Sequence, residues 1–351
     1  MLALAGCAAP VPTLAWAYNP DAYYGDRDWG ASLFTRDVAF VVKAPSISMS
    51  APAVVALDTK TGAELWHRDD AGWLVQSPTG ELWFSSRPYW RMERLDARTG
   101  QVFDVIEFPQ RFSDDAQLYG SSTGLLVGDG ASLTAIDWKT GARRWRTPLS
   151  AGRYWKPTIA GARVAIPGQT HHVLLALETG ATLADIQAAG GCCGAVVSPN
   201  GEHVFFDGED HSTVSVDGQG RVTHFPGQVR AASNTHWVVE QDKVLRAYAY
   251  GRAEPAVTLG PNDADDYFGA VTLAGSNLFY FHKADGGLWQ NDLAKKRRRL
   301  VRSIPGFFAI TTCHGAVSSG PHLGVPPVVA GERLFLQEHS SVVAMSLPPM
   351  R

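Results

Sequence analysis

The chain of 351 residues repeats one short phrase along its length. Copies such as ALDTKTG, RLDARTG and AIDWKTG each end in a glycine and recur at intervals of about 40 residues. The clearest copies close at Gly62, Gly100, Gly141, Gly180 and Gly220. A fixed period of this length indicates an architecture built from one repeated supersecondary unit, rather than a single irregular core.

Each copy reads locally as a strand, a tight turn and a second strand. Residues 54–58 alternate between two faces with a period of two, which is typical of a strand. In the turn, the Asp58 side chain can accept hydrogen bonds from backbone amides, and Gly62 can adopt positive φ. Sustained apolar spacing of three and four is lacking, so we expect few helices.

Two further strand-like runs precede each turn. In one unit, the four runs span residues 72–76, 81–85, 90–96 and 101–105. Four strands in about 40 residues make one blade of a β-propeller. The sequence therefore predicts an all-β fold, a β-propeller of four-stranded antiparallel blades.

The number of blades depends on the two ends of the chain. Looser copies follow around Gly251 and Ala294, and the last unit, RLFLQEHSSVVAMS, lacks a closing strand. The N-terminal run at 14–18, LAWAY, could complete it and close the ring as an eighth blade. Eight blades are favoured and seven are the alternative, because the spacing after Gly220 is irregular. Residues 14–351 are expected to form one propeller domain.

Two copies share the pattern A-x-D-x-x-T-G-x-x-x-W. Its residues are Ala56, Asp58, Thr61, Gly62 and Trp66 in the first copy, and Ala135, Asp137, Thr140, Gly141 and Trp145 in the second. The pattern resembles the blade motif of the quinoprotein-like β-propeller superfamily, whose members carry PQQ-like repeats. The resemblance implies that each Trp docks on the glycine peptide of the adjacent blade, beside the small Ala.

Other copies depart from this pattern. Asp104 stands where the copy at Gly100 should have its Trp, and the copy at Gly180 reads as one turn residue shorter and ends in Ile186. The resemblance is strongest over residues 54–186. The resemblance is weaker after residue 186, but the repeats stay in register to residue 347.

The superfamily has two branches with different functions. One binds pyrroloquinoline quinone and oxidises alcohols or sugars. The other is non-enzymatic and includes the propeller lipoprotein of the outer-membrane β-barrel assembly machine. The enzymes are typically much longer, whereas blades use nearly all of this chain. The resemblance therefore implies a scaffold that binds a protein or peptide partner without a cofactor. The alternative is a quinone- or metal-dependent oxidoreductase with its site in the central channel.

The neighbours Cys192 and Cys193 are the feature that most favours the alternative. In several alcohol-oxidising members a vicinal disulfide lies against the quinone, but early in the chain. Here the pair precedes the fifth Asp turn, so these cysteines are weak candidates for cofactor binding. The four cysteines match no zinc-ligand spacing, and no catalytic or metal-binding residue is predicted.

The N-terminus suggests export. Leu4-Ala5-Gly6-Cys7 resembles a bacterial lipoprotein signal, so residues 1–13 are expected to act in export, with Cys7 as a lipid anchor at the cell envelope. No Lys or Arg precedes Arg27, although a secretory signal should begin with positive charge. The alternative is a hydrophobic N-terminal strand with a buried free cysteine.

Charge excludes one class of partner. The formal net charge of −3 gives no attraction toward nucleic acid, for which a basic domain is expected. KKRRR at 295–299 is the one charge run. It is expected to be a solvated turn that protects an edge strand; the alternative is contact with anionic lipid headgroups or an acidic partner.

Overall fold

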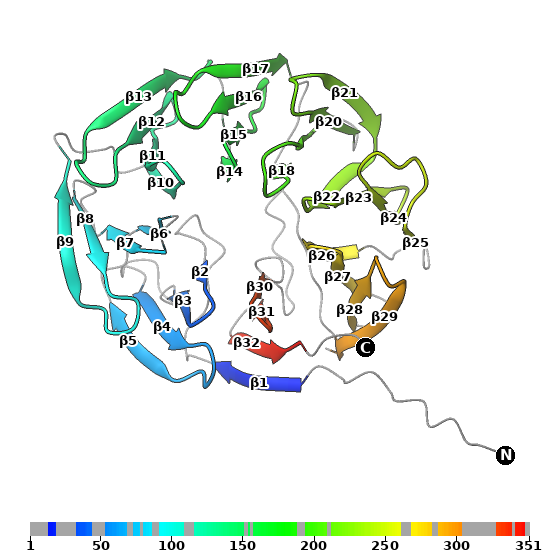
Figure 1. Ribbon diagram of the computed structural model, residues 1–351, viewed down its shortest axis with the longest axis horizontal. Coiled ribbons are helices and arrows are strands. Elements are labelled where there is room, and N and C mark those ends of the chain that lie inside the picture. Colours follow the sequence, from blue (N-terminus) through cyan, green and yellow to red (C-terminus); the bar gives the residue numbers. More distant parts are fainter. Residues whose placement is uncertain are drawn as a thin grey trace.

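Small sheets arranged around a common centre make up the fold in the computed structural model (Figure 1). The structure describes residues 13–18, 33–43, 53–68, 73–77, 80–85, 91–108, 116–150, 154, 157–187, 194–208, 212–260, 268–282, 287–303, 328–338 and 341–347. Within these residues there are eight four-stranded antiparallel sheets and no helix. The predicted all-β propeller is confirmed, with eight blades rather than seven.

Blades 1 to 4 follow one another along the chain, each running from its inner to its outer strand. Blade 1 contains β2 (Leu33–Phe34), β3 (Val38–Lys43), β4 (Ala53–Asp58) and β5 (Glu64–Arg68); blade 2 contains β6 (Trp73–Gln76), β7 (Leu82–Ser85), β8 (Arg91–Leu95) and β9 (Val102–Glu107); blade 3 contains β10 (Gln117–Gly120), β11 (Leu125–Gly128), β12 (Ser132–Ile136) and β13 (Arg143–Pro148); blade 4 contains β14 (Thr158–Ala160), β15 (Arg163–Ile166), β16 (His171–Ala176) and β17 (Thr182–Gln187).

Blades 5 to 7 repeat this order, and blade 8 takes its outer strand from the other end of the chain. Blade 5 contains β18 (Ala195–Val197), β19 (Val204–Asp207), β20 (Ser212–Val216) and β21 (Val222–Pro226); blade 6 contains β22 (Gln228–Ala232), β23 (His236–Gln241), β24 (Val244–Ala249) and β25 (Val257–Leu259); blade 7 contains β26 (Phe268–Ala274), β27 (Asn277–His282), β28 (Gly287–Asp292) and β29 (Arg297–Ser303); blade 8 contains β30 (Val328–Ala330), β31 (Arg333–Glu338), β32 (Ser341–Ser346) and β1 (Thr13–Tyr18).

The ring closes through pairing between its two ends. β1 runs antiparallel to β32, with Thr13 opposite Ser346 and Tyr18 opposite Val342. The predicted closure by the N-terminal run is confirmed. Because the first strand is hydrogen-bonded into the last blade, the ring cannot open without breaking a strand pair.

The hydrophobic core lies between blades. Phe40 and Val54 of blade 1, for example, pack in one cluster with Leu74 and Phe84 of blade 2. A middle strand is covered on both faces by neighbouring blades, so all four residues of β7 are buried. Outer strands such as β13 instead alternate between exposed and half-buried residues.

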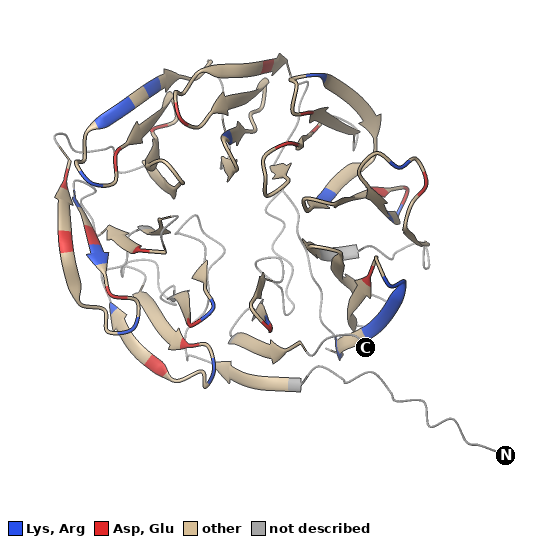
Figure 2. Ribbon diagram, in the orientation of Figure 1, with Lys and Arg blue, Asp and Glu red and all other residues tan. Residues whose placement is uncertain are grey.

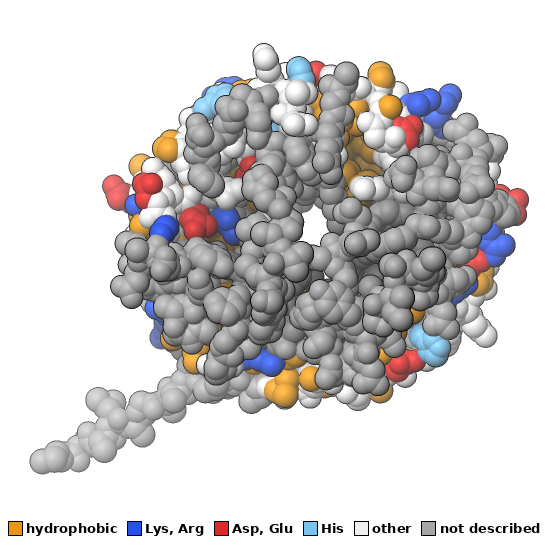
Figure 3. All heavy atoms as spheres, turned by 180° about the vertical axis from the view of Figure 1, so that it is seen from behind, with side chains coloured by type: hydrophobic (Ala, Val, Ile, Leu, Met, Phe, Trp, Pro, Cys, Tyr) orange, Lys and Arg blue, Asp and Glu red, His pale blue; other side chains and the backbone are white. Residues whose placement is uncertain are grey.

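The outer strands form the rim, where much of the charge lies (Figure 2). Seen from behind, the ring has an opening at its centre (Figure 3). Each blade therefore presents two surfaces for function: the inner strand beside the central opening and the outer strand on the rim.

Candidate functional site

The Asp turn of blade 1 is held by its own side chains. Asp58 Oδ1 accepts hydrogen bonds from the amides of Lys60 (2.9 Å) and Thr61 (3.0 Å), and from the Thr61 hydroxyl (3.2 Å). The Gly62 amide donates to the Asp58 carbonyl at 2.8 Å. Gly62 has φ +74°, a conformation in which glycine is the favoured residue.

The turn of blade 3 has the same geometry. Asp137 Oδ1 accepts hydrogen bonds from the Lys139 amide and from the amide and hydroxyl of Thr140, each at 3.0 Å. The Thr140 amide is the main cause of the lowered pKa of Asp137, and it outweighs the opposing effect of burial. Gly141 again has positive φ, +69°. These turns are built to keep a charged carboxylate.

Both motif tryptophans contact the next blade. Trp66 Nε1 donates a 3.0 Å hydrogen bond to the carbonyl oxygen of Ala97 in blade 2. A methyl group added to Gly100 would lie 2.9 Å from the Trp66 indole, so the ring lies directly on that peptide. Trp145 likewise donates to the Leu177 carbonyl of blade 4 at 3.0 Å. Ala56 and Ala135 are buried opposite the two indoles on the neighbouring strands, where a larger side chain would take up the space beside the indole.

A third tryptophan makes the same contact where the ring closes. Trp16 of β1 donates to the Thr59 carbonyl of blade 1 at 2.7 Å and lies against Gly62. It stands opposite the buried Ala344 of β32. Sequence reasoning predicted the closing strand but missed the role of Trp16. A signal was present, because Ala344 and Trp16 reproduce the Ala and Trp of the motif across the two chain ends.

The seam between blades 2 and 3 uses a different side chain. Asp104 stands opposite Arg94, at the place of the motif Trp, as the sequence indicated. Ile106, two residues further along β9, is buried and lies against Gly141, where its Cγ2 would be 2.9 Å from a methyl group on that glycine. An aliphatic side chain on the same face of the strand therefore takes the place of the indole.

The seam between blades 4 and 5 corrects one sequence expectation. The turn at Gly180 was expected to be one residue short, which is wrong: Gly180 donates to the Ala176 carbonyl at 2.8 Å, as Gly62 does to Asp58. The turn therefore has its full length, and Ala176 stands where the other copies have Asp. Ile186 is half-buried in the core shared with blade 5, and Arg163 donates to two carbonyls of the next turn, those of Asp217 (3.0 Å) and Gly218 (2.7 Å).

A quinone or metal site in the central channel would be formed by the inner strands of the blades. In the part of the chain that the structure describes, these strands carry no Asp, Glu, His, Asn or Cys, and Arg230 is their one charged residue. The inner strands are β2, β6, β10, β14, β18, β22, β26 and β30. A calcium-bound quinone needs several oxygen ligands around one point, so these strands do not fit it. Cys7, Cys192 and Cys193 lie outside the described residues.

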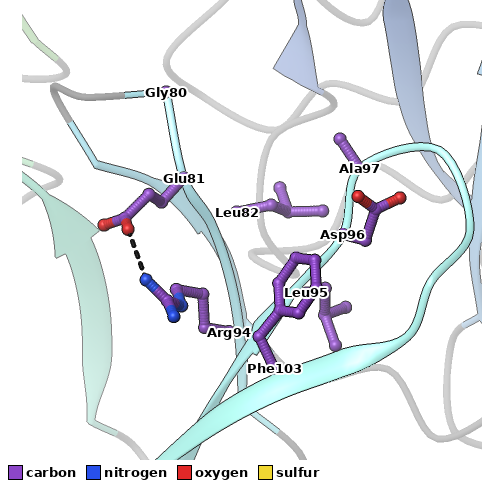
Figure 4. Close-up of a pocket in the computed structure, with 8 residues that line it drawn as sticks. All are labelled: Gly80, Glu81, Leu82, Arg94, Leu95, Asp96, Ala97 and Phe103. Carbon is purple, nitrogen blue, oxygen red and sulfur yellow. Dashed lines mark hydrogen bonds and ion pairs between the residues drawn. The ribbon is translucent and has the colours of Figure 1, made fainter.

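A cavity of about 350 Å³ opens on blade 2 (Figure 4). It lies between the β6–β7 and β8–β9 turns, and its apolar lining includes Leu82, Leu95 and Phe103. On one side, Arg94 Nη1 donates to Glu81 Oε1 at 2.7 Å, and its guanidinium lies 5.8 Å from the centre of the Phe103 ring. The cavity is thus lined by apolar side chains and, on one side, by the ion pair of Arg94 and Glu81.

The strand beside this cavity exposes apolar side chains to solvent. Phe103 is 60% exposed, and Val102 and Val105 of the same strand are also exposed. Within the described residues, no other strand exposes three large apolar side chains. We call the exposed surface of Val102, Phe103 and Val105 the β9 surface. Exposed apolar groups beside a cavity are typical of a site that binds another molecule.

The fold and its seams define an eight-bladed β-propeller built of PQQ-like repeats, which confirms the resemblance inferred from the sequence. Residues 14–153 and 54–303 match the family described as outer membrane protein assembly factor BamB, and the chain belongs to that family. No curated protein sequence matches the chain significantly.

Solved structures share the fold at low sequence identity. The crystal structure of BamB from Moraxella catarrhalis is 15% identical, with a TM-score of 0.60 over 96% of this chain and 100% of that chain. The computationally designed Ika8 protein is 13% identical, with a TM-score of 0.64 over 90% and 95%. Dihydro-heme d1 dehydrogenase NirN in complex with DHE is 15% identical, with a TM-score of 0.51 over 80% and 67%. Since a designed protein and a dehydrogenase share it, the fold alone does not decide function.

None of the described residues belongs to a helix long and apolar enough to cross a bilayer.

Proposed function

We propose that this chain is a non-enzymatic scaffold of the cell envelope that binds a protein or peptide partner through the β9 surface of blade 2. Membership of the BamB family supports this class of function. The lack of carboxylates on the described inner strands argues against the quinone-dependent alternative. The observation that carries the proposal is the exposed Phe103 above a cavity.

The geometry of β9 favours an extended segment as the ligand. β9 is the outermost strand of its sheet, so one edge of its backbone has no strand partner among the described residues. A peptide can add to such an edge through main-chain hydrogen bonds, while alternate side chains enter apolar sites. Asp104 and Glu107 are exposed on the same strand, so a segment that combines apolar residues with Lys or Arg fits best.

The location of the scaffold is a second part of the proposal. Residues 1–13 act in export, Cys7 carries the lipid that anchors the protein, and residues 14–351 form the propeller domain. Mass spectrometry of the mature protein from its host is the test. A lipid on Cys7 at the new N-terminus is expected, and a chain that keeps Met1 without lipid contradicts this part.

Site-specific photo-crosslinking tests the binding site. A photoreactive amino acid placed at position 103 should give a discrete adduct in cells, whereas the same residue at Val222 should not. Val222 is the matched control, because it is 44% exposed on the outer strand of blade 5. The adduct must form again between the two purified proteins. Equal crosslinking at both positions would exclude β9 as the site, and saturable binding of pyrroloquinoline quinone would support the enzyme instead.

A further inference from the structure

Cationic side chains cover the hairpin that joins β28 and β29 in blade 7. Figure 2 shows them as a blue stretch at the rim near the C-terminus. The one carboxylate of the hairpin, Asp292, is buried and accepts hydrogen bonds from the amides of Ala294 (3.1 Å) and Lys295 (3.0 Å). The exposed cations are Lys295, Lys296, Arg297 and Arg298.

These charges differ from those of the other arginine-rich outer strand. On β13, Arg146 lies 3.4 Å from Asp129, and Arg144 lies 3.9 Å from Glu178. Among the ion pairs of the described residues, none involves Lys296, Arg297 or Arg298. The hairpin of blade 7 is therefore a local positive surface on a chain whose net charge is −3.

Aromatic contacts hold one of these cations in place. The Arg298 guanidinium lies 3.8 Å from the centre of the Trp289 ring and 5.7 Å from that of Tyr280. Stacking of this kind orients a guanidinium and leaves its charge unneutralised, so that its N–H groups can still reach an anion.

Exposed apolar residues flank the cations. Leu300 of β29 is 39% exposed, and Leu14 of β1 is 58% exposed. They belong to neighbouring blades: Leu14 stands opposite Met345 of β32, and Met345 packs in one cluster with Val301 of β29. Cations beside exposed apolar side chains are typical of a surface that rests on lipid headgroups.

The chain enters the fold at the same place. Figure 1 shows β1 beginning beside blade 7. Cys7 precedes Thr13 by six residues, so a lipid on that cysteine would keep this part of the rim within about 20 Å of the bilayer.

We infer that the surface of Leu14, Lys296, Arg297, Arg298 and Leu300, the basic rim, docks on the phosphate headgroups of anionic lipids. It would hold the ring edge-on at the membrane and leave the β9 surface, which lies on another part of the rim, open to a partner (Figure 1). The inference rests on the proposed envelope location, but it does not depend on the β9 site.

Vesicle binding by the full chain tests this docking. The chain carries Cys7→Ser, so that no lipid anchor contributes, and the vesicles contain equal parts of phosphatidylglycerol and phosphatidylcholine. We expect binding that falls as salt is raised. K296Q/R297Q should weaken binding by at least tenfold, since each cation near an anionic surface contributes roughly fivefold. The matched control is K139Q/R143Q, which removes two exposed cations from the β12–β13 hairpin.

The other outcomes overturn the inference. Equal binding to pure phosphatidylcholine, or equal weakening by the two double variants, would show that the basic rim does not recognise anionic lipid. Binding to soluble polyglutamate but not to vesicles would assign the surface to an acidic protein. A thermal melt shows that each variant is folded. Because crosslinking at position 103 is measured separately, failure here is distinguishable from failure of the scaffold proposal.

Discussion

Trp66 of blade 1 donates a hydrogen bond of 3.0 Å to the carbonyl oxygen of Ala97, a residue of blade 2. The indole also covers the peptide of Gly100, so one side chain joins an outer strand to the turn of the next blade. Trp145 and Trp16 make the equivalent contacts at two other seams. Stability of the ring should therefore depend on these indoles.

Two substitutions at Trp66 separate its contributions. Trp66→Phe keeps a ring but removes the N–H donor, and should lower the free energy of unfolding by about 1 kcal/mol. Trp66→Ala also removes the packing and should cost about 3 kcal/mol. Urea denaturation measures both. Equal losses for the two variants would show that the packing of the indole adds nothing to the seam.

A pair of glycine substitutions tests the close approach of Trp16. Gly62→Ala and Gly251→Ala impose the same backbone strain, because their φ angles are +74° and +73°. That strain costs about 1–2 kcal/mol. A methyl group at Gly62 would lie 2.7 Å from the Trp16 indole, whereas one at Gly251 would meet no atom of the described residues within 4 Å. Denaturation should show a loss at Gly62 greater by at least about 1 kcal/mol, and equal losses would contradict the contact.

The repeat predicted the blades because strand, turn and docking residue lie close together in the sequence. Trp66 and its partner Gly100 both stand at fixed positions of the repeated motif, so their contact could be expected from the resemblance. Ile106 and Arg163 stand at positions that the motif does not specify. Their contacts with Gly141 and with the turn at Asp217 could therefore not be assigned from the sequence, because many side chains can fill such a contact. The role of Trp16 was hidden because its motif is split between the chain ends.

The Asp turns should make stability depend on pH. The Thr140 amide is the main cause of the lowered pKa of Asp137 in the folded protein. A lowered folded pKa stabilises the fold fully above the unfolded value, near 3.8, and this contribution is lost as pH falls through the folded value. The free energy of unfolding of Asp137→Asn should therefore fall short of that of the natural chain at pH 7 and approach it as pH falls through the folded pKa of Asp137. A difference that stays constant with pH would contradict the assignment.

Lys296 occupies the position that glycine holds in the outer turns of blades 1 to 4. Its φ is +53°, which is unfavourable for a side chain with a Cβ. Lys296→Gly should raise the free energy of unfolding by about 0.5–1 kcal/mol. Lys60→Gly is the control, because Lys60 lies in the equivalent turn of blade 1 outside the left-handed region, and should give no gain. Thermal denaturation compares the two, and a gain from both would exclude this explanation.

The β9 surface shows where sequence reasoning ends for the candidate site. The run QVFDVIEF reads as a strand, but its pattern does not tell which apolar residues are covered. Ile106 is buried because it reaches the seam with blade 3, and Phe103 is exposed on the rim. This difference depends on how neighbouring blades pack, and that arrangement is available only from the fold.

The affinity for the partner captured at position 103 tests the central claim most directly. Calorimetric titration would compare the natural chain with Phe103→Ser and with the control Val222→Ser. An exposed aromatic residue at the centre of an interface contributes about 2 kcal/mol or more, so we predict that Phe103→Ser weakens binding by at least about thirtyfold. Val222→Ser should leave the affinity unchanged. Equal affinities for the natural chain and Phe103→Ser would contradict the account.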